Sequence, residues 1–477
     1  MKIVHAASEA APFVKTGGLG DVMQALPAAL SRYRDCEVSL FLPLYGTLKQ
    51  DPSIHLQKIT DFTVFLGWRE QYVGLFQLKS RAKKKVYFID NEFYFCRNRI
   101  YGEGDDAERF AFYSKAVLAC IAFLGLDPDI IQCNDWQTAC IPVFLHAEFA
   151  QQFPHTKCVF TIHNIEYQGW ANRDFFSNVL ALPEQYRDDL TMGDSINLMK
   201  GAIMTADRVT TVSETYAQEL HYSYFAHGME TCLGYRGADF SGILNGIDTT
   251  VFNPAQDKLL AQPYGADTMR EGKDACKAAL QREVGLAVRP DAPVLAMVTR
   301  LAGHKGIDLL CYILDRLMER DVQFVLVGSG EARFEDALRS AVKRYPGRIA
   351  AILRYDGQLA NRIYAGADLY LMPSQAEPCG LSQLIAMHYG TVPVVHATGG
   401  LRDTVLPYDP ATGDGRGFTF QSYNGDDFLA AIDRALELFT GDRAAWDKLA
   451  QQDMREDFSW RVPAKAYRAL FASLHED

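Results

Sequence analysis

The sequence contains no apolar stretch long enough to cross a membrane. Its longest apolar run, Ala116 to Leu126, is well short of the ~20 residues that a membrane-spanning helix needs. The opening residues, Met1 to His5, lead directly into a strand-like segment and leave no space for a signal peptide. We therefore expect a cytoplasmic protein without a membrane partner.

The cysteines are scattered, and negative charge exceeds positive charge. None of the ten cysteines lies in a Cys-x-x-Cys pair or at ligand spacing from a histidine, a pattern typical of reduced thiols in a cytosolic protein. The 48 Lys and Arg residues against 59 Asp and Glu residues give a net charge of −11, which argues against a nucleic-acid partner. An acidic protein that binds an anion must concentrate its positive charge locally, so basic residues beside glycine-rich turns are informative.

The short motifs of several large enzyme classes are also missing. There is no Gly-x-Ser-x-Gly, no His-Glu-x-x-His, and no kinase or Walker motif. The first glycine-rich turn is not Gly-x-Gly-x-x-Gly, which argues against a dinucleotide oxidoreductase. No Asp-x-Asp stands in a convincing position at a strand end. We therefore expect no metal and no other cofactor, with charge neutralised by Arg300, Lys305, Lys15 and helix ends.

What the chain does contain is a regular alternation of short apolar segments with helix-like segments. This alternation predicts parallel, doubly wound sheets. Between Ile59 and Ile89 the pattern changes to period two, which predicts an inserted antiparallel hairpin. The predicted strands are Ile3 to Ala7, Val38 to Leu42, Ile130 to Trp136, Cys158 to Asn164 and Val209 to Ser213, then Pro293 to Thr299, Val322 to Val327, Ile349 to Leu353, Leu369 to Met372 and Val392 to Val395.

The length and a change in composition predict two domains. The chain of 477 residues is too long for one ordinary core. It becomes loop-like near Gly242 to Pro254 and then polar from Ala255 to Asp291, so we place the boundary there. The expected domains are residues 1–245, joined by a C-terminal helix within 456–477 that packs back on them, and residues 246–455. Two such domains are expected to face a central cleft that binds the ligand.

Lys15-Thr16-Gly17-Gly18-Leu19-Gly20-Asp21 follows the first predicted strand and precedes a helix-like run. Glycines allow backbone N–H groups to approach a phosphate closely, and a helix N-terminus adds partial positive charge. The turn therefore predicts an anion cradle with Lys15 beside it. The alternative is a tight strand-to-helix turn with a surface lysine.

Polar residues also end two strands of the first half. Asp135-Trp136 and His163-Asn164 each follow an apolar strand, where a doubly wound sheet presents its ligand groups. A histidine in this place is a candidate partner for a sugar hydroxyl or for developing positive charge. The alternative is a histidine with a structural role.

The second half opens with a basic loop. Arg300 and Lys305 follow its first strand, and a forked guanidinium with a mobile ammonium suits a diphosphate. A solvated basic surface loop is the alternative.

The strongest local signal is the stretch from Pro373 to Leu381. Pro378 restricts Glu377 to extended geometry, so that the carboxylate is aimed before a glycine that opens a helix. A second glycine turn, Thr398-Gly399-Gly400-Leu401, follows the next strand. An aimed acid beside glycine turns suits a nucleotide-sugar, while an ordinary helix-capping acid is the alternative.

Together these blocks resemble the bacterial glycogen synthases and plant starch synthases, which are glycosyltransferases of the two-Rossmann-domain B fold (GT-B). The resemblance covers essentially the whole chain. The matching blocks are Ser8-Glu9, Lys15 to Asp21, Thr161 to Asn164 with Tyr167-Gln168-Gly169, Asn245 to Asp248, Arg300-Leu301 with Lys305-Gly306, Glu377 to Leu381 and Thr398 to Leu401.

The resemblance implies transfer of glucose from ADP-glucose, with UDP-glucose left open, to the non-reducing end of an α-1,4-glucan such as glycogen, with retention of configuration. The first domain would be the acceptor side and the second would bind the nucleotide-sugar. The implied catalytic residues are His163, Glu377, Lys305 and Arg300. The implied substrate-binding residues are Lys15, Gly17, Gly18, Asp21, Asp135, Asn164, Asn245, Tyr355, Cys379, Gly380, Leu381, Thr398, Gly399 and Gly400.

The chain departs from the family pattern at a few positions. Gln375-Ala376 stand for the usual Arg-Phe, and Asn134 stands for a histidine. His304 replaces a glutamine, and Asp356-Gly357 follow Tyr355 in place of the usual pattern with a glutamate. Two rival functions stay open: another B-fold sugar transferase or nucleotide-sugar epimerase, and an inactive glucan-binding regulator.

Overall fold

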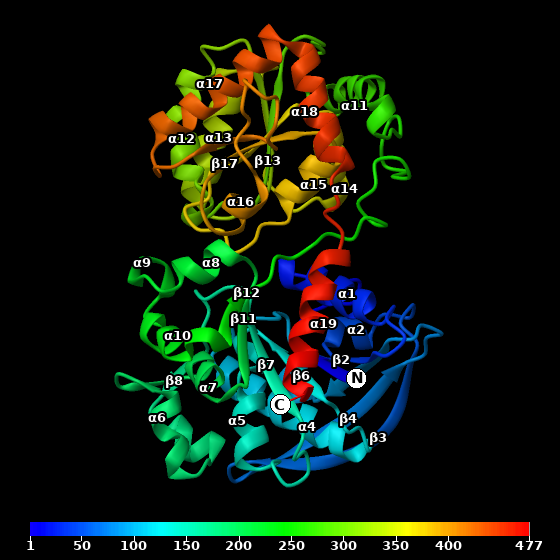
Figure 1. Cartoon of the computed structure of the whole chain (residues 1–477), viewed down its shortest axis with the longest axis vertical. Coiled ribbons are helices and arrows are strands. Elements are labelled where there is room, and N and C mark those ends of the chain that lie inside the picture. Colours follow the sequence, from blue (N-terminus) through cyan, green and yellow to red (C-terminus); the bar gives the residue numbers. More distant parts are fainter. Residues whose placement is uncertain (477) are drawn as a thin grey trace. The chain divides into compact units, whose positions relative to one another are not determined.

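The computed structural model describes residues 1–476, which form two compact units (Figure 1). Unit 1 consists of Met1–Asn245 together with the chain from Trp460 onward, and unit 2 consists of Gly246–Ser459. The chain therefore leaves unit 1, builds all of unit 2, and returns. Within the described residues no helix is long and apolar enough to cross a membrane.

Unit 1 contains a nine-stranded sheet, whose strands in chain order are β1 (Lys2–Ala6), β2 (Glu37–Pro43), β3 (Leu56–Leu66), β4 (Arg69–Leu78), β5 (Lys85–Asp90), β6 (Ile130–Asn134), β7 (Lys157–Ile162), β11 (Arg208–Thr211) and β12 (Phe240–Gly242). The spatial order is β12-β11-β7-β6-β1-β2-β5-β4-β3, and the strands from β12 to β5 run parallel. The central strands are buried almost throughout because helices cover both faces of the sheet.

The predicted hairpin insertion is confirmed. β3 and β4 are antiparallel neighbours with Phe62 opposite Val73, and β4 pairs antiparallel with β5. A small second sheet of β8 (Trp170–Asn172), β9 (Thr191–Met192) and β10 (Ser195–Asn197) was not predicted, because strands of two or three residues carry no readable period.

The helices of unit 1 include the long helices α1 (Gly18–Leu30), α4 (Asp106–Phe123) and α19 (Arg461–Glu476) and several short ones. Ser213 caps one of the short helices, as predicted, by accepting a hydrogen bond from the N–H group of Tyr216. The other helices are α2 (Gly46–Lys49), α3 (Glu92–Phe95), α5 (Cys140–Ala147), α6 (Arg187–Leu190), α7 (Leu198–Thr205), α8 (Glu214–Glu219), α9 (Ser223–Ala226) and α10 (Glu230–Arg236).

The last helix of the chain, α19, completes unit 1. It lies beside α1 (Figure 1), and Trp460, Tyr467 and Phe471 are buried in the core of unit 1. An ion pair joins Arg468 of α19 to Asp35, close to the start of β2. The core of unit 1 is therefore made from both ends of the chain.

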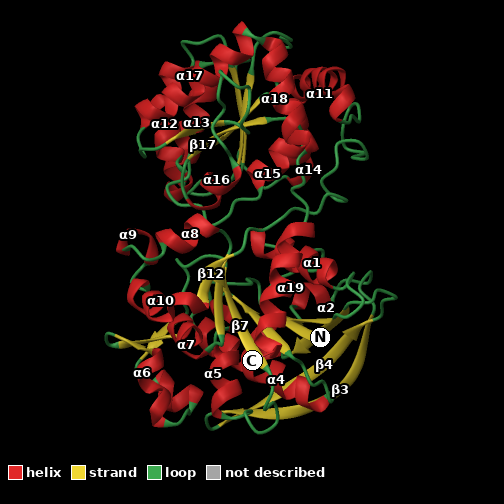
Figure 2. Ribbon diagram, viewed as in Figure 1, coloured by secondary structure: helices red, strands yellow, loops and turns green. Residues whose placement is uncertain are grey.

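Unit 2 contains a six-stranded, all-parallel sheet. Its strands are β13 (Val294–Val298), β14 (Gln323–Val327), β15 (Ile349–Ile352), β16 (Leu369–Met372), β17 (Val392–His396) and β18 (Phe418–Phe420), in the spatial order β15-β14-β13-β16-β17-β18. The prediction of two doubly wound α/β domains is confirmed, although the three-residue β18 was missed. Figure 2 shows helices around the strands of unit 2 and around the central strands of unit 1, whereas β3 and β4 lie at the outer side of the unit 1 sheet.

The helices of unit 2 include one that the sequence did not reveal. The stretch Ala255 to Asp291, interpreted as a polar connection, contains the 16-residue helix α11 (Met269–Val284). The other helices are α12 (Ile307–Leu317), α13 (Ala332–Arg344), α14 (Gly357–Gly366), α15 (Ser382–His388), α16 (Gly399–Thr404), α17 (Gly425–Gly441) and α18 (Arg443–Arg455).

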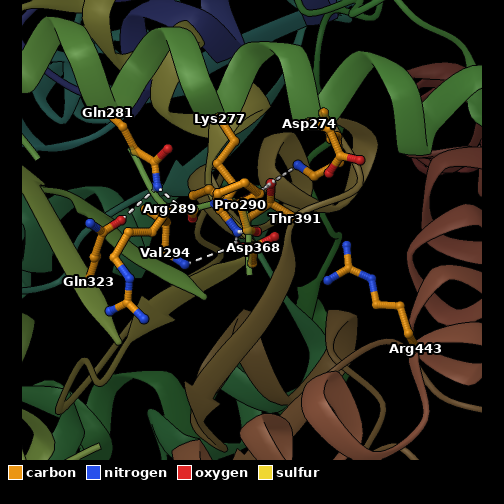
Figure 3. Close-up of polar contacts among 12 residues, drawn as sticks. Asp274, Lys277, Gln281, Arg289, Pro290, Val294, Gln323, Asp368, Thr391 and Arg443 are labelled. Carbon is orange, nitrogen blue, oxygen red and sulfur yellow. Dashed lines mark hydrogen bonds and ion pairs between the residues drawn. The ribbon is translucent and has the colours of Figure 1, made fainter. Parts of the chain in front are cut away.

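Two buried lysines, Lys273 and Lys277, attach α11 to the amino ends of the sheet strands. Figure 3 labels Lys277 with its partner Asp368. Lys277 lies 2.8 Å from the carboxylate of Asp368, which also accepts the N–H group of Val294, the first residue of β13. Lys273 donates to the hydroxyl of Thr391 at 2.7 Å, just before β17, and burial lowers the pKa of Lys273 to about 7. This network lies at the end of the sheet opposite the predicted site.

Candidate active site

Each parallel sheet has a point, beside its first strand, where the strand order reverses. In unit 1, β1 lies between β2 and β6, and in unit 2, β13 lies between β14 and β16. Sheets of this class bind ligands outside the carboxyl ends of the strands at such a point. Most of the predicted residues of unit 1 follow β1, β6 and β7, and most of those of unit 2 follow β13, β16 and β17.

The glycine-rich loop after β1 is organised by a carboxylate of the protein itself. Oε2 of Glu9 accepts the N–H groups of Thr16 at 2.5 Å and of Gly17 at 3.3 Å, and the Thr16 hydroxyl donates to Oε1 at 3.0 Å. Tyr101 donates to Oε1 of Glu9 at 3.1 Å. The anion-binding amides of the first half of the loop are thus occupied by Glu9, and helix α1 begins at the next residue, Gly18.

Lys15 and Asp21 neutralise one another on this loop. Their Nζ and Oδ1 atoms lie 2.7 Å apart. Burial raises the pKa of Asp21, and the positive charge of Lys15 opposes that change. Lys15 is therefore the partner of an acid on the first turn of α1.

Asp135 joins the carboxyl ends of β6 and β7. It has a φ of 58°, in the left-handed region that residues other than glycine rarely adopt. Its Oδ1 atom accepts the N–H groups of His163 at 2.7 Å and Asn164 at 3.2 Å. Burial raises the pKa of Asp135 to about 7, while these two N–H donors act in the opposite direction. The structure thus brings together three of the predicted residues.

The ring of His163 contacts the residue before Asp135. Its Nε2 atom lies 2.9 Å from Oδ1 of Asn134. Burial lowers the pKa of His163 to about 3, so its imidazole is neutral at physiological pH. Neutral histidine offers one donor and one acceptor, which suits hydrogen bonding to hydroxyl groups.

In unit 2, two predicted site residues of opposite charge, Lys305 and Glu377, form an ion pair. Nζ of Lys305, in the loop after β13, lies 2.7 Å from Oε2 of Glu377, in the loop after β16. The hydroxyl of Ser374 donates to the same oxygen at 2.9 Å. Both side chains are largely buried, with 19% of Lys305 and 9% of Glu377 exposed. Oε1 of Glu377 has no hydrogen-bond partner among the described residues.

The loops after β16 and β17 are pressed together at Gly400. Its N–H group donates to the backbone oxygens of Glu377 at 3.1 Å and Pro378 at 3.2 Å. A methyl group on Gly400 would lie 2.3 Å from the backbone oxygen of Cys379, so only glycine fits. The other predicted residues of these two loops are Gly380, Leu381, Thr398 and Gly399.

Three predicted residues stand apart from these clusters. Arg300 is exposed in the loop after β13, and Tyr355 is 81% exposed after β15, at the edge of the sheet. Asn245 is the buried last residue before unit 2, and its Oδ1 atom has no partner within the described part of the chain.

Sequence reasoning missed the residues that hold the named ones in place. Glu9 was noted within a motif and Asn134 as a departure, but neither was assigned to the site. Ser374 was also visible, three residues before Glu377. His396 was not visible, because a histidine in a buried strand gives no sign that its Nδ1 lies 2.8 Å from the backbone oxygen of Ser374.

Comparison with known proteins gives the same family as the sequence motifs, over essentially the whole chain. Residues 2–234 match the model of the starch synthase catalytic domain, and residues 283–453 match that of glycosyl transferases group 1. Glycogen synthases of Exiguobacterium sibiricum and Desulfitobacterium hafniense are 45% and 42% identical, over 99% and 100% of this chain and 98% and 99% of theirs.

A solved structure extends the likeness to three dimensions. The catalytic domain of starch synthase IV from Arabidopsis thaliana, bound to ADP and acarbose, is 34% identical with a TM-score of 0.93, over 100% of this chain and 99% of that one. Sucrose-phosphate synthase from Thermosynechococcus elongatus, 19% identical with a TM-score of 0.60 over 99% of both chains, shares the fold. This chain belongs to the glycogen and starch synthase family of glycosyltransferases.

Proposed function

We propose that this protein transfers glucose from ADP-glucose to the non-reducing end of an α-1,4-glucan, with retention of configuration. The observation that carries the proposal is the Lys305–Glu377 pair at the reversal point of the unit 2 sheet. A cation and a carboxylate side by side suit a diphosphate on one side and sugar hydroxyls on the other. The ADP bound to the Arabidopsis enzyme supports an adenine nucleotide as the donor.

The proposed roles follow the charges of the side chains. Arg300 and Lys305 hold the diphosphate, while the open oxygen of Glu377 accepts hydroxyls of the transferred glucose. His163 lies beside the reacting carbon in this scheme. The other predicted residues bind the remaining parts of the two substrates in this scheme. The distal phosphate and the acceptor are bound by Lys15, Gly17, Gly18, Asp21, Asp135, Asn164 and Asn245. The adenine is bound by Tyr355, and the rest of the donor by Cys379, Gly380, Leu381, Thr398, Gly399 and Gly400.

In the proposed reaction the bond between glucose C1 and the diphosphate oxygen breaks as the acceptor 4-hydroxyl attacks the same face. The departing phosphate takes the proton of that hydroxyl. Arg300 and Lys305 stabilise the negative charge that develops on the leaving group, which is electrostatic preorganisation without a covalent intermediate. Retention follows because attack and departure share one face of the sugar.

A side-by-side assay tests the proposal. The purified protein is incubated with glycogen and labelled ADP-glucose or labelled UDP-glucose. We expect label in the glycogen, release of ADP, and faster transfer from ADP-glucose, with the new linkage cleaved by an enzyme specific for α-1,4 bonds. Glucan binding without nucleotide release would overturn the proposal in favour of a regulator. Conversion of the donor without a glucan acceptor would point to an epimerase.

A further inference from the structure

The side chain of Asn134 has only one orientation that satisfies its neighbours. It is fully buried at the end of β6, and its Nδ2 atom lies 3.0 Å from the backbone oxygen of Ala6 and 3.4 Å from that of Gln132. Backbone oxygens accept hydrogen bonds and cannot donate them, so the NH₂ group must face them. The Oδ1 atom of Asn134 therefore faces the other way, toward His163.

This orientation decides which ring nitrogen of His163 carries the hydrogen. Oδ1 of Asn134 lies 2.9 Å from Nε2 of His163, and an amide oxygen can only accept, so Nε2 must donate. The imidazole is neutral, as burial lowers its pKa, and it therefore has a single N–H group. Its Nδ1 atom keeps a lone pair and has no hydrogen-bond partner among the described residues.

The backbone of the same histidine is held by the next residue of the chain. Asp135 accepts the His163 N–H group at 2.7 Å, so the consecutive residues 134 and 135 hold the ring and the main chain of His163. Asn134 is in turn attached to the end of β1 through Ala6. The ring is thus fixed in position and in hydrogen-bond polarity by the three strands β1, β6 and β7.

We propose that Asn134 is a positioning residue, which holds His163 with its hydrogen on Nε2 so that Nδ1 accepts a hydrogen bond from a hydroxyl of the transferred glucose. This inference rests on the proposed function, in which His163 lies beside the reacting sugar. An acceptor at Nδ1 orients a hydroxyl, whereas the opposite tautomer would present a hydrogen there.

The first readout is the tautomer itself, which does not depend on activity. Nitrogen-15 NMR of protein labelled at histidine distinguishes the two neutral forms, and the His163→Gln variant identifies the His163 signals by difference. We expect the wild-type protein to show the hydrogen on Nε2. We expect Asn134→Leu, which cannot accept, to give a mixture of both forms. At pH 6, Asn134→Asp should restore the wild-type signature, because a buried carboxyl group in its neutral form donates to the backbone oxygen of Ala6 and accepts from Nε2 with its other oxygen.

The second readout is kinetic. With glycogen and ADP-glucose, Asn134→Leu should lower kcat by about tenfold or more while KM for ADP-glucose stays within about twofold, since a misoriented contact acts mainly in the transition state. Asn134→Asp should recover part of that loss. Gln132→Leu is the matched control: it removes a buried amide of the same strand, whose Nε2 donates to Thr161 Oγ1 at 2.8 Å, and should leave both readouts unchanged.

Three results would overturn the inference. They are a wild-type ring with its hydrogen on Nδ1, an Asn134→Leu protein with unchanged tautomer and kcat, and a Gln132→Leu protein that loses as much kcat as Asn134→Leu. Absence of glucosyl transfer in the wild-type protein would instead refute the proposed function, and the NMR result would still decide whether Asn134 fixes the tautomer.

Discussion

At both points of strand-order reversal, charged side chains of the candidate site already have partners within the protein. Glu9 occupies the amides of the loop after β1, Lys15 is paired with Asp21, and Lys305 is paired with Glu377. Paired charges limit the penalty of burial, since a lone buried ion is far less stable. The arrangement also orients each cation before an anionic substrate competes for it.

Removal of the Lys305 ammonium should weaken the handling of the diphosphate. We expect Lys305→Ala to lower kcat/KM by a factor that corresponds to a loss of about 2–4 kcal/mol of transition-state stabilisation. The reason is that a desolvated charged contact is lost and Glu377 is left without its cation. Steady-state kinetics with ADP-glucose and glycogen measure the change. The control is Lys343→Ala, which removes an exposed lysine of α13 and should leave kcat/KM unaltered. Equal kinetics for the two variants would remove Lys305 from the site.

The raised pKa of Asp135 makes stability depend on pH. The folded-state pKa is about 7, against 3.8 for the ordinary carboxyl, so the folded protein binds a proton that the unfolded chain releases between these values. The contribution of the protonated Asp135 carboxyl group to folding stability is fully present below pH 3.8 and is lost as the pH rises through about 7. Asp135→Asn keeps an acceptor for both N–H groups and cannot ionise.

We therefore expect Asp135→Asn to gain stability relative to the wild-type protein between pH 5 and pH 8, by about 2–4 kcal/mol. Urea unfolding of both proteins at the two pH values measures the difference. Asp127→Asn, which changes an exposed carboxyl of the same unit, should follow the wild-type protein throughout. A constant difference between Asp135→Asn and wild type across this range would contradict the assigned shift.

Among the elements, α11 is the clearest case of a structure hidden from the sequence. Its lysines at positions 273 and 277 look like surface residues, yet both are buried against the amino ends of the sheet strands. Only their partners reveal this, and Asp368 and Thr391 lie about 90 to 120 positions further along the chain. The apolar strands β13 to β17 were predictable, by contrast, because burial on both faces makes them continuously hydrophobic.

Disruption of the Lys277–Asp368 pair should destabilise unit 2. Lys277→Met leaves a buried, unpaired carboxylate, and we expect the apparent free energy of unfolding to fall by about 3–5 kcal/mol. The double variant Lys277→Met with Asp368→Asn removes both charges, keeps the acceptor for Val294, and should recover most of the loss. Urea unfolding measures both. Arg282→Met changes an exposed cation of the same helix and should have little effect. No recovery in the double variant would contradict an uncompensated charge as the cause.

The candidate site, too, was predictable only in part. The loops that carry Lys15, Asp135, His163, Lys305 and Glu377 were predictable, because polar residues and glycines follow apolar strands. Which side chains contact one another was not predictable for Lys305 with Glu377 or for His163 with residues 134 and 135, since these contacts join loops separated along the chain. The roles assigned to these residues in the reaction stay predictions.

For the whole molecule, the unusual feature is a unit built from both ends of the chain. Within unit 2, the two ends of the segment lie side by side, with the N–H group of Ile247 donating to the backbone oxygen of Phe458 at 2.8 Å. Phe471 of α19 is fully buried in the core of unit 1. Unit 1 therefore depends on the last part of the chain for its stability.

Truncation of one aromatic side chain in α19 tests this dependence. We expect Phe471→Ala to destabilise unit 1 by about 3–5 kcal/mol, as for other large-to-small substitutions in a core. Limited proteolysis should then cut first within residues 1–245. Tyr235→Ala, at a position 78% exposed on α10, should behave as wild type. Earlier cleavage in residues 246–459 would contradict the assignment of α19 to unit 1.

The return of the chain also bears on the order in which the protein matures on the ribosome. Unit 2 is one continuous segment, Gly246–Ser459, whereas unit 1 receives helix α19 only after all of unit 2 has been synthesised. We expect stalled nascent chains that have exposed all of unit 2 but not α19 to resist protease in unit 2 while unit 1 is still digested. The unit whose sheet is synthesised before unit 2 would then become protease-resistant after it.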